Sequence, residues 1–397
     1  MKTPRFTIDA REVSRTLQGA FAEVLHSVGA DPSTPQSIVR HLGLNKNLAW
    51  KISRIVQAEE AASVLELMPG SSGIRIFLNA MDKAGIEKQY INKAREAVKS
   101  YEELIRIHSG NRATLEMMSS DLDQAGQQQR DEYHRKLLFQ GSSYVWGAQA
   151  RVISKIGVVY PGSKPGLLNV ATIGGFVDFR RLRPNITWTL TKRDSFNDDG
   201  SEIVNSRWIP LDPNHPSNDS PPLLTEFCSE SLPQLRKITT ANEIRFDLPE
   251  GEIGNTGAIT CFLGMIKTDL PMYKAPDNAH GSYTVRCEVP AELLNMDMFF
   301  HHSLGLTEPP EVKLRSNVDM YSGSNGNSEL PFYDRIQDLG ISSIPRPAPE
   351  IPRSREMIEY IFSLLAMPLI EFHGYRIRMA HPAYPTSLEM RYPLHDR

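Results

Sequence analysis

The chain has 397 residues, which at roughly 150 residues per domain predicts two or three domains. Hydrophobic residues make up 40% and charged residues 23% of the sequence. This composition supports a buried core and excludes intrinsic disorder for most of the chain. The net charge is −3, from 44 Lys and Arg against 47 Asp and Glu, and this balance excludes a generally basic, histone-like nucleic-acid binder.

Cysteine use and hydropathy indicate the compartment. Cys228, Cys261 and Cys287 are odd in number and form no C-x-x-C pair, which predicts neither a disulfide framework nor a structural zinc site. The first thirty residues lack the apolar run of a signal peptide, and no stretch approaches 18 uncharged apolar residues. We therefore expect a cytoplasmic protein with no membrane partner.

The N-terminal part, to about residue 147, is predicted to be helical because its apolar residues recur at three-and-four spacing. Thr34 followed by Pro35 is typical of a helix start, and Gly29 and Gly85 are typical of helix ends. The expected helices cover residues 12–28, a segment that begins at Pro35, and residues 73–84, 87–108, 112–122 and 124–138.

From about residue 151, proline and glycine become frequent, and short β-branched and aromatic runs replace the helical pattern. A proline-rich connector at residues 344–353 precedes one late helix, expected at 355–367. The fold class predicted is α+β, with an all-α N-terminal domain followed by a β-rich domain over residues 148–397. The expected strands are 151–159, 169–180, 187–192, 243–246, 258–265, 283–289 and 371–379.

The sharpest motif is the segment from Pro35 to Val56, PQSIVRHLGLNKNLAWKISRIV. Its pattern predicts a short helix, a tight turn at Gly43, where positive φ costs little, and a second helix. Ile38, Leu42, Leu44, Leu48 and Ile52 occupy the positions that would pack the two helices together. The segment resembles the helix-turn-helix of bacterial DNA-binding transcriptional regulators. Two residues depart from the usual pattern, Val39 where a smaller residue is expected and Trp50 on the outer face.

The polar face of the second predicted helix contains the candidate DNA-binding residues. Asparagine suits a bidentate contact with adenine, and lysine and arginine suit guanine or phosphate. Residues 32–58 contain four basic side chains and no acidic one, which favours a nucleic-acid partner locally. The candidate contacts with double-stranded DNA are Asn45, Lys46, Asn47, Trp50, Lys51 and Arg54. An alternative for Trp50 is packing on the next helix.

These motifs suggest a division of the helical part. We expect a helix-turn-helix domain over residues 1–68 and a helical extension over 69–147. The amphipathic helices within residues 73–108 either complete the core or form a homo-oligomer interface, because two-fold operators commonly match dimeric regulators.

The β-rich domain shows no recognisable catalytic set. It lacks H-E-x-x-H, a phosphate-binding glycine loop and a G-x-S-x-G elbow. The loop Arg193–Glu202 has serine where a calcium loop needs Asp and Glu. His301-His302 and the group Glu371, His373, His381 are the only metal-like groupings. We expect this domain to bind no metal and no cofactor and to have no enzymatic activity. We expect it instead to serve in sensing or assembly.

The leading hypothesis is a sequence-specific DNA-binding transcriptional regulator. One alternative is an interaction or assembly protein whose tri-helical unit docks a protein partner. A third hypothesis is an enzyme with an unrecognised site in residues 151–397.

Overall fold

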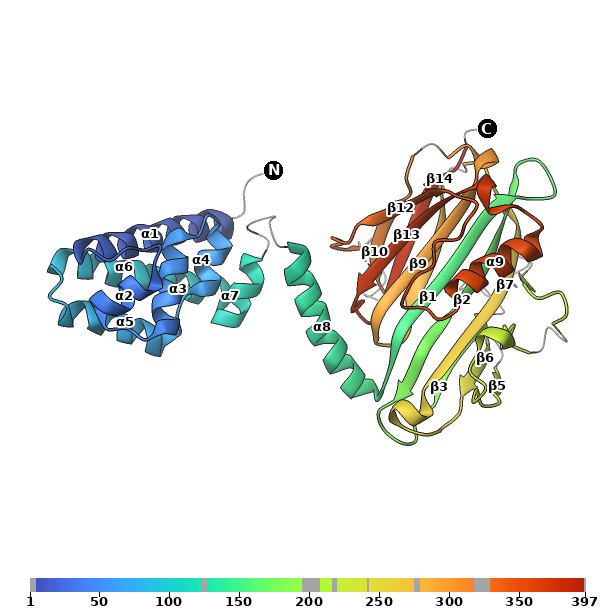
Figure 1. Cartoon of the computed structure of the whole chain (residues 1–397), viewed down its shortest axis with the longest axis horizontal. Coiled ribbons are helices and arrows are strands. Elements are labelled where there is room, and N and C mark those ends of the chain that lie inside the picture. The colour runs from blue at the N-terminus through green and yellow to red at the C-terminus, as the bar shows by residue number, and fades with distance from the viewer. Residues whose placement is uncertain are drawn as a thin grey trace. The chain divides into compact units, whose positions relative to one another are not determined.

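The computed structural model describes residues 5–120, 122, 127–194, 208–215, 220–240, 243–274, 279–306, 308–317 and 329–395. It divides into two units, Met1–Arg130 and Asp131–Arg397, the first helical and the second rich in strands (Figure 1). This confirms the α+β class. Most of the loop considered for calcium, from residue 195 on, lies outside the described residues.

The N-terminal unit is built from amphipathic helices. The first helix begins at Arg5, earlier than the pattern predicts, because Phe6 packs against the ring of His108 and Asp9 binds that imidazole at 2.9 Å. The helices are α1 Arg5–Ser27, α2 Pro35–Leu42, α3 Lys46–Gln57, α4 Ala61–Leu67, α5 Ser71–Lys83, α6 Lys88–Leu104 and α7 Arg112–Ser119, with a π-helical turn Ile105–Ser109 after α6.

One hydrophobic core runs through all of these helices. Phe21 of α1 meets Phe77 of α5 edge-on, with 4.9 Å between ring centroids, and Tyr101 of α6 lies in the same core. Buried residues of this core run from Ala10 to Leu122. The unit therefore does not divide at residue 68, which differs from the predicted boundary between 1–68 and 69–147.

Helix α8, Gln127–Trp146, continues the chain into the C-terminal unit. It ends eight residues later than predicted. Arg135 is 5% exposed and binds Asp131 at 2.8 Å and Asp334 at 3.0 Å. Gly147 then allows the turn into the first strand with a φ of 70°.

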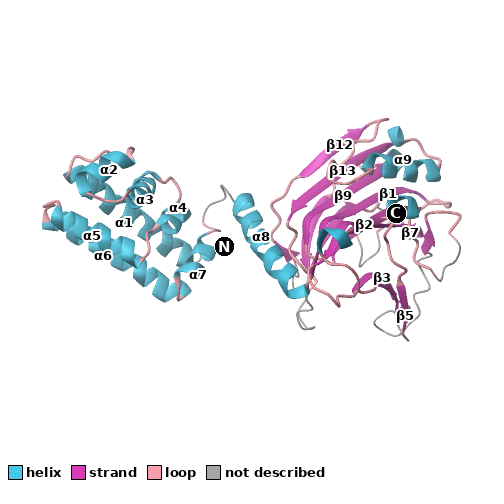
Figure 2. Cartoon of the chain, turned by 60° about the horizontal axis from the view of Figure 1, so that its bottom comes forward, coloured by secondary structure: helices cyan, strands magenta, loops and turns pink. Residues whose placement is uncertain are grey.

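The described residues of the C-terminal unit form three sheets (Figure 2). All seven predicted strands are confirmed. The seven-stranded sheet has the order β12-β13-β9-β1-β2-β7-β4, and its strands are β1 Ala148–Pro161, β2 Leu167–Arg181, β4 Trp208–Pro210, β7 Ile259–Pro271, β9 Ala291–His301, β12 Ile336–Ile341 and β13 Phe372–Ala380. The other two sheets contain β8 His280–Cys287, β10 Glu311–Ser316, β11 Glu329–Leu330 and β14 Thr386–Pro393, and β3 Trp188–Asp194, β5 Arg236–Thr239 and β6 Glu243–Leu248.

The large sheet is buried on both faces. Helix α9, Ser354–Leu365, confirms the predicted late helix and covers one face, where Phe362 packs against Phe299 of β9. On the other face, Met298 and Phe300 of β9 share a core with Leu388 and Met390 of β14. Strand β9 was not predicted, because a strand buried on both sides shows no alternation of apolar and polar residues.

A buried ion pair fixes the proline-rich connector to this sheet. Arg376 of β13 and Asp297 of β9 are 5% and 3% exposed and form two parallel bonds of 2.7 and 2.6 Å. Arg376 also donates to the carbonyl oxygens of Arg346 and Pro347. Residues 344–353 form no helix or strand, so these bonds hold the connector in place.

Replacing Arg376 with alanine is expected to lower the free energy of unfolding of the C-terminal unit by about 3–5 kcal/mol, because Asp297 is then left charged and unpaired inside the protein. Arg378→Ala is the matched control. Arg378 lies on the same strand and pairs with Glu350, but it is 43% exposed, and its loss is expected to cost less than about 1 kcal/mol. Urea unfolding of the full chain measures both. Equal losses for the two variants would contradict this assignment.

Candidate nucleic-acid interface

The turn between α2 and α3 has the predicted conformation. Helix α2 begins at Pro35, as predicted, and ends at Leu42. Gly43 follows with a φ of 65° and a ψ of 24°, and its N–H donates to the carbonyl oxygen of Val39. An added Cβ at Gly43 would meet no atom within 4 Å. Glycine is thus favoured here by backbone conformation alone.

The predicted packing between the two helices is confirmed. Five apolar side chains at and beside the turn are at most 6% exposed and belong to the core of the N-terminal unit. They are Ile38, Leu42, Leu44, Leu48 and Ile52. Val39, where a smaller residue is usual, is half-buried against the same core. The apolar half of α3 therefore faces inward, and its other half faces solvent.

Buried polar groups, which the sequence pattern did not predict, hold α3 against its neighbours. Ser53 is 1% exposed and donates to the carbonyl oxygen of Pro32 at 2.6 Å, which Gln57 also binds at 2.8 Å. Gln18 of α1 donates to the carbonyl oxygens of Ile55 and Ala58 at the end of α3. The sequence signal for these hydrogen bonds was a polar residue, Ser53, on the predicted inner face of α3.

The exposed face of α3 carries most of the predicted contacts. Lys46, Asn47 and Arg54 are exposed, and Trp50 is 48% exposed. Trp50 is not among the side chains that pack on the core, so the alternative of packing on the next helix is not favoured. Lys51 lies at the edge of this face and is half-buried. We call these five residues the α3 outer face.

Asn45 has a structural role. It precedes α3, and its side-chain oxygen accepts a hydrogen bond of 2.9 Å from the backbone N–H of Leu48. This is the helix-capping bond typical of asparagine. While the cap is formed, one lone pair of this oxygen is occupied and the side chain is held in one orientation, which limits how Asn45 can present its amide to a partner.

The four cations between residues 32 and 58 lack carboxylate partners. Arg40, Lys46, Lys51 and Arg54 make no ion pair with any residue that the structure describes. Elsewhere in the same unit, Lys93 binds Glu23 at 2.7 Å and Arg95 binds Asp82 at 2.9 Å, among other pairs. The charge of the α3 outer face is therefore not neutralised locally, which favours an anionic partner.

Asp31, the acidic residue that comes just before this segment, is engaged by hydroxyl groups. It accepts hydrogen bonds from Ser33 and Thr34, and the bonds from Ser33 hold its pKa below the ordinary value. Thr34 uses its hydroxyl for this contact and makes no side-chain bond to the start of α2.

The metal-like groupings of the C-terminal unit are only partly brought together. His301 contacts Glu371 at 3.2 Å, whereas His373 binds Asp338 at 2.7 Å. The ring of His381 lies against Phe139 of α8. Within the described ranges, no three His, Cys, Asp or Glu side chains gather in a way that could hold a metal ion.

One buried amine stands out among the ionisable groups of this unit. Lys155 of β1 donates to the carbonyl oxygen of Thr284 at 2.7 Å and lies 4.7 Å from the ring centroid of Tyr283. Burial lowers the pKa of Lys155 to about 8. These contacts give the amine a role in joining β1 to β8.

Comparisons with known proteins add no family. No family model and no curated protein matches the chain. Among solved structures, one similarity is to an M1 zinc metallopeptidase from Deinococcus radiodurans, with 11% sequence identity and a TM-score of 0.22. The alignment covers 62% of this chain and 42% of that chain, so this chain spans less than half of the matched protein. At this TM-score, the similarity carries no argument about fold or activity.

None of the described helices combines the length and the apolar character that a membrane-crossing helix requires.

Backbone conformation predicts opposite effects for two glycine substitutions, one in the turn and one in α1. Gly43→Ala is expected to lower the free energy of unfolding by about 1–2 kcal/mol, because alanine is strained at positive φ. Gly19 lies in the middle of α1 on its exposed side, and nothing lies within 4 Å of an added Cβ. Gly19→Ala is therefore expected to raise the free energy of unfolding by about 0.5–1 kcal/mol. Urea unfolding of the full chain, followed by circular dichroism, checks both signs. A loss at Gly19 equal to that at Gly43 would refute the argument.

The cap at Asn45 makes a second prediction about α3. Asn45→Ala is expected to destabilise the N-terminal unit by about 1 kcal/mol, whereas Asn45→Ser retains an acceptor and most of that stability. Asn47→Ala, an exposed change with no cap to remove, is the control. Thermal unfolding compares the three variants, and an unchanged melting temperature for Asn45→Ala would show that the cap contributes nothing.

Proposed function

We propose that the protein is a sequence-specific double-stranded DNA-binding transcriptional regulator that reads DNA through the α3 outer face. The observation that carries this proposal is a helix after a tight turn whose inner half is fully packed and whose outer half presents unpaired cations. Helices of this arrangement fit the major groove, where phosphate contacts position the protein and base contacts select the sequence.

The side chains suggest separate roles in such a complex. Lys46, Lys51 and Arg54 supply positive charge for phosphates or for guanine. Asn47 is exposed and free of the cap, so it is the asparagine suited to a bidentate contact with adenine. Asn45 has a smaller part in recognition, because its oxygen holds the start of α3. This refines the prediction that treated the two asparagines alike.

One observation favours the alternative of docking a protein partner. Trp50 lies in the middle of the α3 outer face and is 48% exposed, and tryptophan is enriched at the energetic centres of protein interfaces. No comparable observation favours an enzyme within the described residues, so the enzyme hypothesis is not proposed.

Self-association through residues 73–108 stays a prediction. The apolar side chains of α6 that prompted it, such as Ile91 and Val98, are buried in the unit's own core. A dimer of this kind would have to use the outer faces of α5 and α6, where Ile76 is 47% exposed.

The decisive experiment is a salt titration of DNA binding by the full chain. If the four cations of residues 32–58 each displace a counterion, a plot of log K against log salt has a slope of about −3 to −4. The variant Lys51→Ala/Arg54→Ala is expected to reduce the magnitude of this slope by about 2. Fluorescence anisotropy with a labelled duplex pool measures both.

The matched control removes two exposed charges from elsewhere in the chain. Arg15→Ala/Lys164→Ala changes the net charge equally but leaves the α3 outer face intact, so its slope is expected to equal that of the unmodified protein. No binding at low salt, or equal effects of the two double variants, would overturn the proposal. The docking alternative would be supported if the unmodified protein binds no duplex but binds a protein partner, and if Trp50→Ala abolishes that partner binding.

A further inference from the structure

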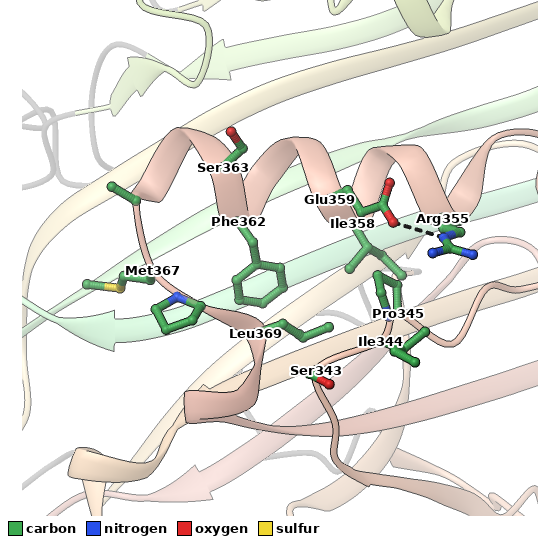
Figure 3. Close-up of a pocket in the computed structure, with 12 residues that line it drawn as sticks. Ser343, Ile344, Pro345, Arg355, Ile358, Glu359, Phe362, Ser363, Met367 and Leu369 are labelled. Carbon is green, nitrogen blue, oxygen red and sulfur yellow. Dashed lines mark hydrogen bonds and ion pairs between the residues drawn. The ribbon is translucent and has the colours of Figure 1, made fainter.

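The C-terminal unit has an open groove beside α9. It lies between this helix, the segment at residues 343–345 and the turn at residues 366–369, and its volume is about 450 Å³ (Figure 3). That volume falls within the range of small-molecule sites. The groove belongs to the described residues of one unit, and neither the α3 outer face nor the buried core accounts for it.

The floor of the groove is apolar and firmly packed. Ile358 is fully buried and Phe362 is 6% exposed. The ring of Phe362 meets those of Phe299 and Phe372 edge-on, at centroid distances of 5.4 and 4.9 Å. Figure 3 shows Phe362 directed toward Leu369 across the groove.

Both walls are held in place by hydrogen bonds within the chain. Ser342 uses its hydroxyl oxygen to accept from the backbone N–H of Ile344 and to donate to the carbonyl oxygen of the same residue. On the opposite side, the N–H of Met367 donates to the carbonyl oxygen of Phe362. Beyond the first wall, Arg376 holds the connector by the carbonyl of Arg346. A pre-formed site avoids the free-energy cost of ordering its walls when a ligand binds.

One end of the groove is charged. The Nε of Arg355 donates to Glu359 at 2.8 Å, and Figure 3 places this pair beside Pro345. The two terminal nitrogens of Arg355 have no partner among the residues that the structure describes. Because guanidinium groups bind carboxylates through adjacent N–H groups, this end can take an anion while the bond to Glu359 remains.

We propose that this groove binds a small amphipathic anion, with an apolar body on Ile344, Phe362 and Leu369 and an acidic group on Arg355. The apolar lining selects the body, and the free donors of Arg355 select the charge. The proposal goes beyond DNA binding and does not depend on it.

The test uses the full chain with two defined probes. Fluorescence of 1-anilinonaphthalene-8-sulfonate, which combines an aromatic body with a sulfonate, reports binding, and decanoate competes for the site. Saturable binding and displacement by decanoate are expected. Arg355→Gln is expected to lower the affinity for decanoate by about tenfold, because one charged, hydrogen-bonded contact is lost. Competition by decanol, which has no charge, is expected to be unchanged.

Two exposed isoleucines supply a matched pair of variants. Ile344, 62% exposed, lines the groove, whereas Ile370, 50% exposed, does not. Ile344→Asp places a carboxylate in the groove and is expected to weaken both probes by at least about tenfold, because an anion must then approach a like charge on an apolar surface. Ile370→Asp is expected to bind both probes with the same affinity as the unmodified protein.

Three results would overturn the proposal. The first is no saturable binding of either probe, and the second is equal affinity in the two isoleucine variants. The third is that sedimentation shows a dimer, that Ile344→Asp disrupts this dimer and that decanoate does not bind. The groove would then be an interface between copies of the chain.

Discussion

The candidate site depends on one constraint, the packing of the apolar half of α3 against α1 and α2. Gly43 takes the left-handed conformation that lets the chain leave α2, and Leu44 and Leu48 then enter the core. Ser53 and Gln18 complete this attachment through hydrogen bonds to backbone carbonyl oxygens. Once the inner half of the helix is fixed, the direction of every outer side chain follows from the 3.6-residue period.

A comparable constraint organises the C-terminal unit. Its large sheet is covered on one face by α9 and on the other by the sheet that contains β14. Within this interior, Arg376 and Asp297 form a buried ion pair. That pair also holds the connector beside α9, so the wall of the groove and the interior of the sheet depend on the same side chain. The groove is thus a consequence of how the sheet is covered.

The sequence predicted the features that depend on near neighbours. The turn at Gly43, the start of α2 at Pro35 and the inner face of α3 all follow from residues a few positions apart. Strand β9 was missed because both of its faces are buried, and its partners β1 and β13 lie far away in the sequence. The groove was equally out of reach, because Ile344, Phe362 and Leu369 meet only in the folded chain. The outward direction of Lys46 and Arg54 was predicted, whereas the capping role of Asn45 became clear only from the bond to Leu48.

The most direct measurement of the central claim is lysine footprinting of the full chain with and without duplex DNA. Acetylation followed by mass spectrometry compares Lys46 and Lys51 of α3 with Lys83 of α5 and Lys99 of α6, of which Lys46, Lys83 and Lys99 are exposed. The account predicts that DNA protects Lys46 and Lys51 and leaves the other two as reactive as before. Uniform protection of all four lysines, or none at Lys46 and Lys51 when DNA is bound, would contradict recognition through α3.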